Sequence, residues 1–217
     1  MPLTQARKDA IASMEFGALI QQTASVRGYE YTRHSYRKEL VDIYVATDDG
    51  HGKQKKGAVI EAVKRIVDKG IRLPKGLKVY CSGAWVSQNR AFHRDVNWDQ
   101  IAVVVLGSKA CRGGRSNANS AILPPLYKKL DAPTVTCIHE IGHILHGINV
   151  GDAFFDHTDS RAWTKPPKNA DGVSGYAQAN KKEFVAEVFA GLVLGQGYSE
   201  DCMKEYEALG GPSVPRS

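Results

Sequence analysis

The segment 134–146 (TVTCIHEIGHILH) constrains this chain most, because ionisable side chains interrupt an almost wholly apolar helical pattern. The pattern predicts a helix over 134–146 that ends at Gly147. A helix places His139 and His143 one turn apart on the same face, with β-carbons about 5–6 Å apart. Two imidazoles in that position can bind one zinc ion at about 2.0–2.1 Å each. The spacing therefore predicts half of a zinc site.

Glu140 completes an H-E-x-x-H motif, which is typical of zinc peptidases when it lies on a helix. Its side chain is rotated about 100° from His139, so it is poorly placed to be a ligand but can reach a water on the metal. Zinc lowers the pKa of such a water to about 7. A charged glutamate in an apolar helix also needs a buried partner. We therefore expect Zn²⁺ as the cofactor and Glu140 as the general base.

A catalytic zinc site needs one more protein ligand and an open position. His146 follows on the same helix, and three imidazoles along one rigid helix cannot converge on one ion, so we expect His146 behind the ligands or at the helix end. The longer motif with a third histidine is absent, since position 149 is Asn. His157 remains an alternative ligand.

The segment 181–194 predicts a second helix, capped by Asn180 and ended by Gly195. Glu183 and Glu187 share a face of this helix with two alanines, which allow close packing against another helix. One carboxylate can bind the metal and the other can fix a histidine tautomer. We expect Glu183 to be the ligand, with Glu187 as the alternative. Glu183 could instead only close a capping box with Asn180.

The pairing of HEIGH with the segment SGYAQANKKEFVAEVFA resembles the catalytic domain of anthrax-toxin lethal-factor-like zinc metallopeptidases. That family includes small bacterial peptidases that cut between prolines. The resemblance covers roughly residues 101–195. It implies that Glu183 is the third zinc ligand, that Glu187 lies behind the ligands, and that the Tyr176 hydroxyl stabilises an oxyanion. A second similarity is to intracellular metallopeptidases that cleave phage-type repressors, although their histidine falls one place later than His146.

The implied fold is α+β and zincin-like, with a small twisted sheet beside the active-site helix and the second ligand-bearing helix. We expect one domain over 1–197, with its catalytic core at 77–195, followed by a C-terminal helix and a frayed tail in 198–217. Strands are predicted at 39–47, 77–82 and 101–107, and further helices at 4–22, 57–69 and 199–209. Segment 101–107 should lie near a sheet edge, where an extended peptide can add as a strand. The segments 108–130 and 148–179 read as loops.

The charge of +6 is unevenly spread: residues 1–130 hold 22 Lys and Arg against 11 Asp and Glu, and the remainder hold 7 against 12. The basic clusters around Lys53–Lys56 and Arg112–Arg115 lie in Gly-rich segments without interleaved aromatics, so we expect a solvated surface rather than a nucleic-acid site. The predicted partner is a protein or peptide substrate. The alternatives are a basic nucleic-acid-binding protein with structural zinc and an inactive interaction module.

No stretch reaches the ~20 apolar residues of a membrane span, and the first residues lack the apolar core of a secretory signal. We therefore expect a soluble protein, a secreted effector or toxin if a specialised system exports it. The four cysteines form no C-x-x-C pair, which argues against a zinc ribbon. Cys137 falls in the apolar helix and is expected to be a buried thiol.

Overall fold

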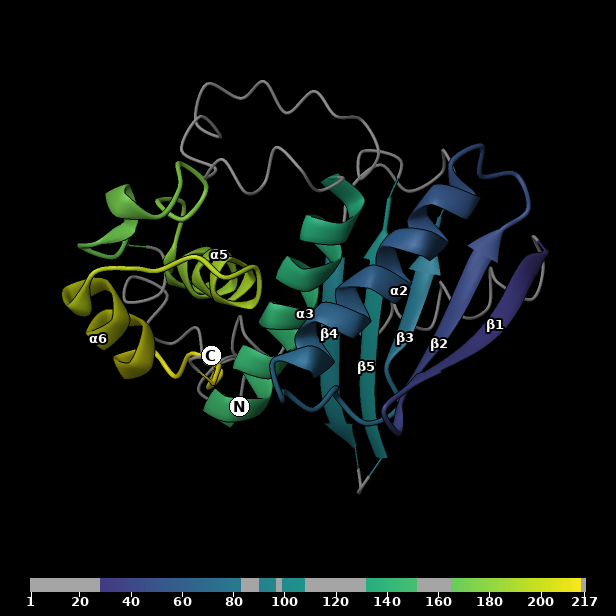
Figure 1. Cartoon of the computed structure of the whole chain (residues 1–217), viewed down its shortest axis with the longest axis horizontal. Helices are drawn as coiled ribbons and strands as arrows, with labels where there is room; N and C mark the ends of the chain where they lie inside the picture. Colours follow the sequence, from purple (N-terminus) through teal and green to yellow (C-terminus); the bar gives the residue numbers. More distant parts are fainter. Residues whose placement is uncertain (1–27, 83–89, 97–98, 108–131, 152–164, 216–217) are drawn as a thin grey trace, which may run out of the picture.

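The computed structural model describes residues 28–82, 90–96, 99–107, 132–151 and 165–215. They form a five-stranded mixed sheet with helices packed against it (Figure 1). The strands are β1 (Tyr29–Tyr36), β2 (Glu39–Ala46), β3 (Lys78–Cys81), β4 (Arg90–Val96) and β5 (Asp99–Leu106). The helices are α2 (Gly52–Asp68), α3 (Ala132–Val150), α5 (Lys181–Val193) and α6 (Glu200–Ala208), with a 3-10 turn, η6, at Ala170–Gly172. The predicted α+β class is confirmed.

The strand order is β1-β2-β3-β5-β4. The central pairs β2–β3 and β3–β5 are parallel, whereas the outer pairs β1–β2 and β4–β5 are antiparallel. Helix α2 makes the crossover from β2 to its parallel neighbour β3. Helix α3 lies beside α2 and separates the sheet from α5 (Figure 1). This layering puts α3 in the middle of the molecule.

The core forms between the sheet and these helices. Val41, Ile43 and Val45 alternate along β2 and are buried, as period-2 side chains on one face of a strand must be. Across from them, α2 buries an apolar stripe that includes Val59, Val63 and Ile66. Burying such side chains contributes about 1.5–3 kcal/mol each. The sheet and α2 thus form a packed core against which α3 lies.

The three predicted strands are confirmed as β2, β3 and β5, but the sequence analysis missed β1 and β4. Strand β1 consists of exposed and half-buried residues and contains no apolar run that would mark a strand. As a result, segment 101–107 is not the sheet edge itself. It lies second from that edge, and β4 is the edge strand.

Helix α2 begins earlier than predicted, so Lys53, Lys55 and Lys56 lie in its first turns rather than in a loop. Lys55 is fully buried and makes an ion pair with Asp49, so it does not belong to a solvated basic surface. Gly70, at φ +75°, follows this helix as expected. The predicted helix over 4–22 and the basic cluster at 112–115 lie outside the described residues.

Helix α3 is longer at both ends than the predicted 134–146, and Gly147 does not end it. Gly147 is buried inside the helix, where glycine is about 1 kcal/mol less favourable than alanine. Tertiary packing of α3 outweighs this cost. The chain leaves the helix at Gly151, whose φ of +63° is the left-handed conformation expected just past a helix end. The first residues of the predicted loop 148–179 are therefore helical.

Helices α3 and α5 pack at close range because α3 carries a glycine at the contact. A β-carbon added to Gly142 would lie 2.8 Å from Phe189 Cδ1 and 3.5 Å from the Ala186 Cα. No side chain fits there unless the Phe189 ring or α5 moves. The small residues expected to allow a close approach thus bring the two ligand-bearing helices together.

The segment after α6 is not frayed up to residue 215. The Tyr206 hydroxyl donates a hydrogen bond of 2.6 Å to the Pro212 carbonyl, and Pro212 is buried. Val214 packs against the core. The expectation of a frayed tail is wrong for residues 210–215, because a hydrogen bond from Tyr206 and the packing of Val214 hold the segment against the core.

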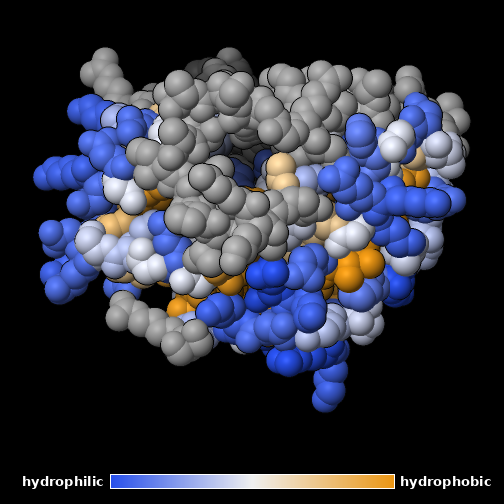
Figure 2. Space-filling model, turned by 45° about the horizontal axis from the view of Figure 1, so that its top comes forward, coloured by the Kyte–Doolittle hydropathy of each residue, from blue (hydrophilic) through white to orange (hydrophobic). Residues whose placement is uncertain are grey.

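The described surface seen in Figure 2 is largely hydrophilic, with small and separate hydrophobic areas. The large exposed hydrophobic residues are Tyr31, Leu40 and Tyr176. Within the described residues, none of the helices is long and apolar enough to cross a membrane. Cys81, Cys137 and Cys202 are buried free thiols, as predicted for Cys137.

Candidate metal centre

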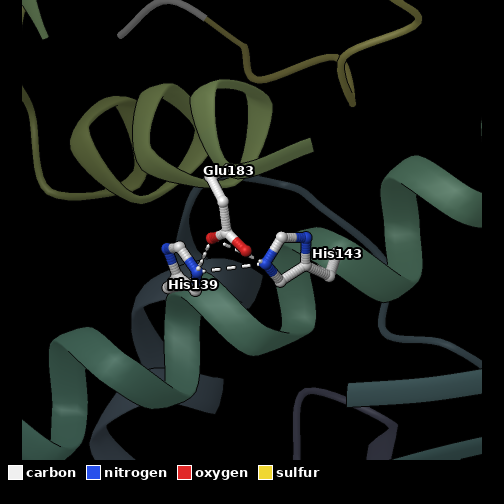
Figure 3. A group of neighbouring side chains, drawn as sticks. All are labelled: His139, His143 and Glu183. Carbon is white, nitrogen blue, oxygen red and sulfur yellow. Dashed lines mark hydrogen bonds and ion pairs between the residues drawn. The ribbon is translucent and has the colours of Figure 1, made fainter. Parts of the chain in front are cut away.

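Helices α3 and α5 bring three potential metal ligands to one point. His139 and His143 project from α3, and Glu183 projects between them from the first turn of α5 (Figure 3). The two histidine Nε2 atoms lie 3.1 Å apart. Glu183 Oε2 lies 3.1 Å from His139 Nε2 and 3.2 Å from His143 Nε2. Within the described residues, this is the group that could hold a metal ion.

The spacing of these atoms fits a small divalent ion. Ligands about 2.0–2.1 Å from a tetrahedral zinc lie about 3.3 Å from one another. The three ligand atoms of His139, His143 and Glu183 fall within 0.2 Å or so of that edge length. Two imidazole nitrogens and a carboxylate oxygen are also the ligand types that zinc prefers. The residues present therefore fit a zinc ion.

Glu187 lies behind His139, one turn after Glu183 on α5. Its Oε1 is 2.8 Å from His139 Nδ1, on the side of the ring away from Glu183. The two atoms lie within hydrogen-bonding distance, although their alignment departs from good hydrogen-bond geometry. Glu187 Oε2 accepts a hydrogen bond of 2.9 Å from Ser174 Oγ. Glu187 is therefore placed where it could orient His139, while Glu183 lies with the two Nε2 atoms.

The electrostatics of the site favour a cation. Burial opposes protonation of His139, but the contacts of its two ring nitrogens with the Glu183 and Glu187 carboxylates outweigh burial and raise the pKa of His139. Burial likewise opposes ionisation of Glu183, yet its bonds to both histidines hold its pKa below the usual range. The pKa of Glu187 is lowered in the same way, chiefly by His139 against the effect of burial. Two buried carboxylates held in the ionised form favour positive charge at this point, whether from a protonated histidine or from a bound cation.

Glu140 and Tyr176 both lie close to this group. Glu140 follows His139 on α3 and is buried, with 8% of its surface exposed. The Tyr176 ring lies 5.8 Å from the His139 ring, centre to centre, and its side chain is half exposed. The tyrosine comes from the turn between η6 and α5. A buried acid and an exposed phenol thus flank the candidate ligands.

His146 faces away from the candidate ligands. Its Nε2 is 2.8 Å from the Leu209 carbonyl, so this nitrogen donates and the ring ties α3 to the segment after α6. Burial is the main reason that the pKa of His146 is lowered to about 4. The side chain is therefore neutral at physiological pH. His157, the alternative ligand, lies outside the described residues.

Asn180 caps α5 as predicted, with its Oδ1 accepting from the amides of Lys182 and Glu183. The Glu183 carboxylate does not need to close a capping box, because its Oε2 faces the two histidines. The cap instead fixes the start of α5, so that Glu183 falls opposite His139 and His143. The helix cap and the candidate ligand thus use different atoms of the same segment.

Sequence reasoning missed Ser174, which is buried beside Glu187. Its only sequence signal is its place two residues before Tyr176, in a segment rich in small and polar residues.

A comparison with protein-family models finds no match for the sequence, and a comparison with curated proteins finds none either.

Proposed function

We propose that this protein is a zinc-dependent endopeptidase with a zincin-like catalytic domain. The single observation that carries the proposal is the convergence of His139 Nε2, His143 Nε2 and Glu183 Oε2 to 3.1–3.2 Å from one another. Three acceptor atoms at that spacing are complementary to a zinc ion. The substrate class is a protein or peptide, as the resemblance to lethal-factor-like metallopeptidases implies.

The proposal assigns His139, His143 and Glu183 to hold the zinc ion. When bound, zinc would act as a Lewis acid and lower the pKa of a water to about 7. Glu140 would take the proton of that water, since its carboxylate lies on the same helix in a low-dielectric setting. It would then pass the proton to the departing amine.

The Tyr176 hydroxyl would donate a hydrogen bond to the oxygen of the scissile carbonyl as negative charge develops there. A hydrogen bond that strengthens in the transition state lowers the barrier, and removing one such donor typically costs about 10²–10³ in rate. The half-exposed position of this ring beside His139 supports the role, because the phenol must meet a substrate arriving from solvent.

The edge strand β4 supports a peptide substrate. Helix α3 contacts β4, so the sheet edge and the candidate ligands lie on neighbouring elements. An extended peptide can pair with the free edge of a sheet through main-chain hydrogen bonds. Delivery of the enzyme as a secreted effector or toxin remains part of the proposal.

A structural zinc in a nucleic-acid-binding protein is the contrasting proposal. A structural site is usually closed by four protein ligands, whereas the described group has three. The burial of Lys55 also removes one charge from the basic surface on which nucleic-acid binding would depend.

The test compares wild type with Glu140→Gln and with Glu183→Gln. Glu140→Gln keeps the size and shape of a side chain that is not proposed as a ligand. Glu183→Gln removes the charge of the proposed carboxylate ligand. We expect wild type to bind one zinc ion and to cleave a peptide library. Glu140→Gln should keep the zinc and lose cleavage by about 10²–10⁴-fold. If wild type binds zinc, cleaves no peptide and retards a DNA probe, the peptidase assignment is wrong.

A further inference from the structure

Ser174 occupies a position that links two parts of the candidate site. It is 2% exposed and lies at the end of η6, two residues before Tyr176. Its Oγ donates a hydrogen bond of 2.9 Å to Glu187 Oε2 and accepts one of 3.0 Å from the Ala177 amide. One hydroxyl thus contacts both α5 and the turn that carries Tyr176.

The direction of each bond follows from the groups involved. A serine hydroxyl has one hydrogen to donate, and an ionised carboxylate can only accept. The hydrogen of Ser174 therefore goes to Glu187, and an oxygen lone pair receives the amide of Ala177. This arrangement allows no exchange of roles, so the hydroxyl is fixed in one orientation.

Through Glu187, the Ser174 hydroxyl also bears on which ring nitrogen of His139 carries the proton. The other oxygen of the same carboxylate lies 2.8 Å from His139 Nδ1. Since a carboxylate oxygen only accepts, this contact favours a proton on Nδ1, which leaves Nε2 as the nitrogen that can give its lone pair to a metal. Nε2 is the atom that faces His143 and Glu183. A carboxylate held by Ser174 thus presents His139 in the tautomer that binds a cation.

The bond from Ala177 determines the position of Tyr176. It closes the turn 174–177, and a second bond of 3.0 Å from the Ala179 amide to the Tyr176 carbonyl continues it. The ring of Tyr176 projects from this turn to 5.8 Å from the His139 ring. Loss of the hydroxyl would free the turn and the carboxylate together.

We propose that Ser174 is a positioning residue that orients His139 for zinc through Glu187 and holds the turn bearing Tyr176 through the Ala177 amide. The role at Tyr176 rests on the proposed peptidase function. The role at His139 concerns metal affinity alone and needs no peptidase activity.

The first experiment measures zinc affinity by competition with a chelator of known affinity. Ser174→Ala should bind zinc about 10- to 100-fold more weakly than wild type, the range typical for partners behind metal ligands. Ser174→Thr keeps the hydroxyl and should restore much of the affinity. The control is Ser199→Ala, which removes a similar bond, from the Cys202 amide to Ser199 Oγ, at the start of α6. Ser199→Ala should leave zinc affinity unchanged.

A double-mutant cycle tests whether Ser174 acts through Glu187. If it does, the variant Ser174→Ala/Glu187→Ala should bind zinc as weakly as Glu187→Ala alone. Additive losses would overturn this part of the proposal, as would a wild-type affinity in folded Ser174→Ala. Circular dichroism of each variant establishes that it is folded, and Ser174→Ala remains decisive if Ser174→Thr does not fold.

The second experiment measures kcat at saturating zinc and so isolates the turn. Ser174→Ala should lower kcat in wild type but have a smaller effect in Tyr176→Phe, because the hydroxyl that it positions is then gone. Equal effects in both backgrounds would overturn the role at Tyr176. A wild-type protein that binds zinc but cleaves no peptide would sink the peptidase function, while the zinc measurements would still decide the role at His139.

Discussion

Lys55 and Asp49 form one buried group of charges, and the candidate ligands with Glu187 form another. Lys55 Nζ lies 2.6 Å from Asp49 Oδ2 and donates a bond of 2.9 Å to the Ser82 carbonyl. Its charge is balanced by a carboxylate, and the side chains are 0% and 4% exposed. This group is complete within the protein. It ties the start of α2 to the end of β3.

The second group has the opposite character. Glu183 and Glu187 bring two carboxylates, and the two histidines bring rings that are neutral when they bind a metal. Two imidazole nitrogens and a carboxylate oxygen converge at a spacing that fits one metal ion. Two buried carboxylates in one group favour a ligand that supplies positive charge. The first group is a structural ion pair, whereas the second is a candidate metal site.

The largest expected effect is on metal binding by Glu183→Ala. We expect zinc affinity to fall by more than about 100-fold, beyond the range for partners behind the ligands. Saturating zinc should raise the stability of wild type, by about 2.7 kcal/mol at 100 times its dissociation constant, but not that of the variant. Chelator competition and thermal unfolding with and without zinc check this. Stabilisation of the variant by zinc equal to that of wild type would contradict the ligand assignment.

Lys55→Met should lower the stability of the protein without changing its zinc binding. Removing the lysine leaves Asp49 buried without its partner, so the free energy of unfolding should fall by about 3–5 kcal/mol. Zinc stoichiometry should stay at the wild-type value. Urea unfolding measures the loss, and the double variant Lys55→Met/Asp49→Leu serves as the control, because it removes both charges and should recover stability. Loss of zinc from folded Lys55→Met would break the contrast between the two groups.

His146 is a third kind of buried polar group, because burial favours its neutral form. Its pKa is lowered to about 4, so between pH 6.5 and pH 4 the unfolded chain takes up a proton that the folded chain excludes. The contribution to stability is fully present above pH 6.5 and is lost as the pH falls toward 4. We expect this loss to be about 1–3 kcal/mol.

The measurement is urea unfolding of wild type and His146→Gln at several pH values between 4 and 7. The variant should lose less stability across this range, since glutamine does not titrate. An identical pH dependence in the two proteins would show that His146 titrates normally. Zinc stoichiometry should be the same in both, because His146 faces the Leu209 carbonyl.

The smallest effects concern a helical glycine beside each group. Gly142→Ala should cost about 1–3 kcal/mol, because the new methyl group would overlap Phe189 and push α5 away from α3. It should also weaken zinc binding, since the ligands come from both helices. Gly57→Ala is the matched control, as nothing lies within 4 Å of the added carbon, and it should stabilise α2 by about 0.5–1 kcal/mol. Thermal unfolding and chelator competition check both variants. Unchanged zinc affinity in Gly142→Ala would contradict the dependence on close helix packing.

Much of the site could be predicted because its signals are local. The spacing of His139 and His143 on one apolar helix fixes their common face, and Glu183 follows a capping asparagine at a helix start. Periodicity also identified β2, β3 and β5. The sheet edge was placed less well, since neither β1 nor β4 carries an apolar run.

Local sequence was enough to place two imidazoles one helical turn apart and two carboxylates on a second helix, because helix geometry is periodic. The three-dimensional fold was needed to show that Glu183 contacts both rings, that Ser174 bonds to Glu187, and that Lys55 is buried with Asp49. These contacts join residues distant in sequence. They depend on how closely α3 and α5 pack and on which charges the folded chain neutralises, and no local pattern encodes either.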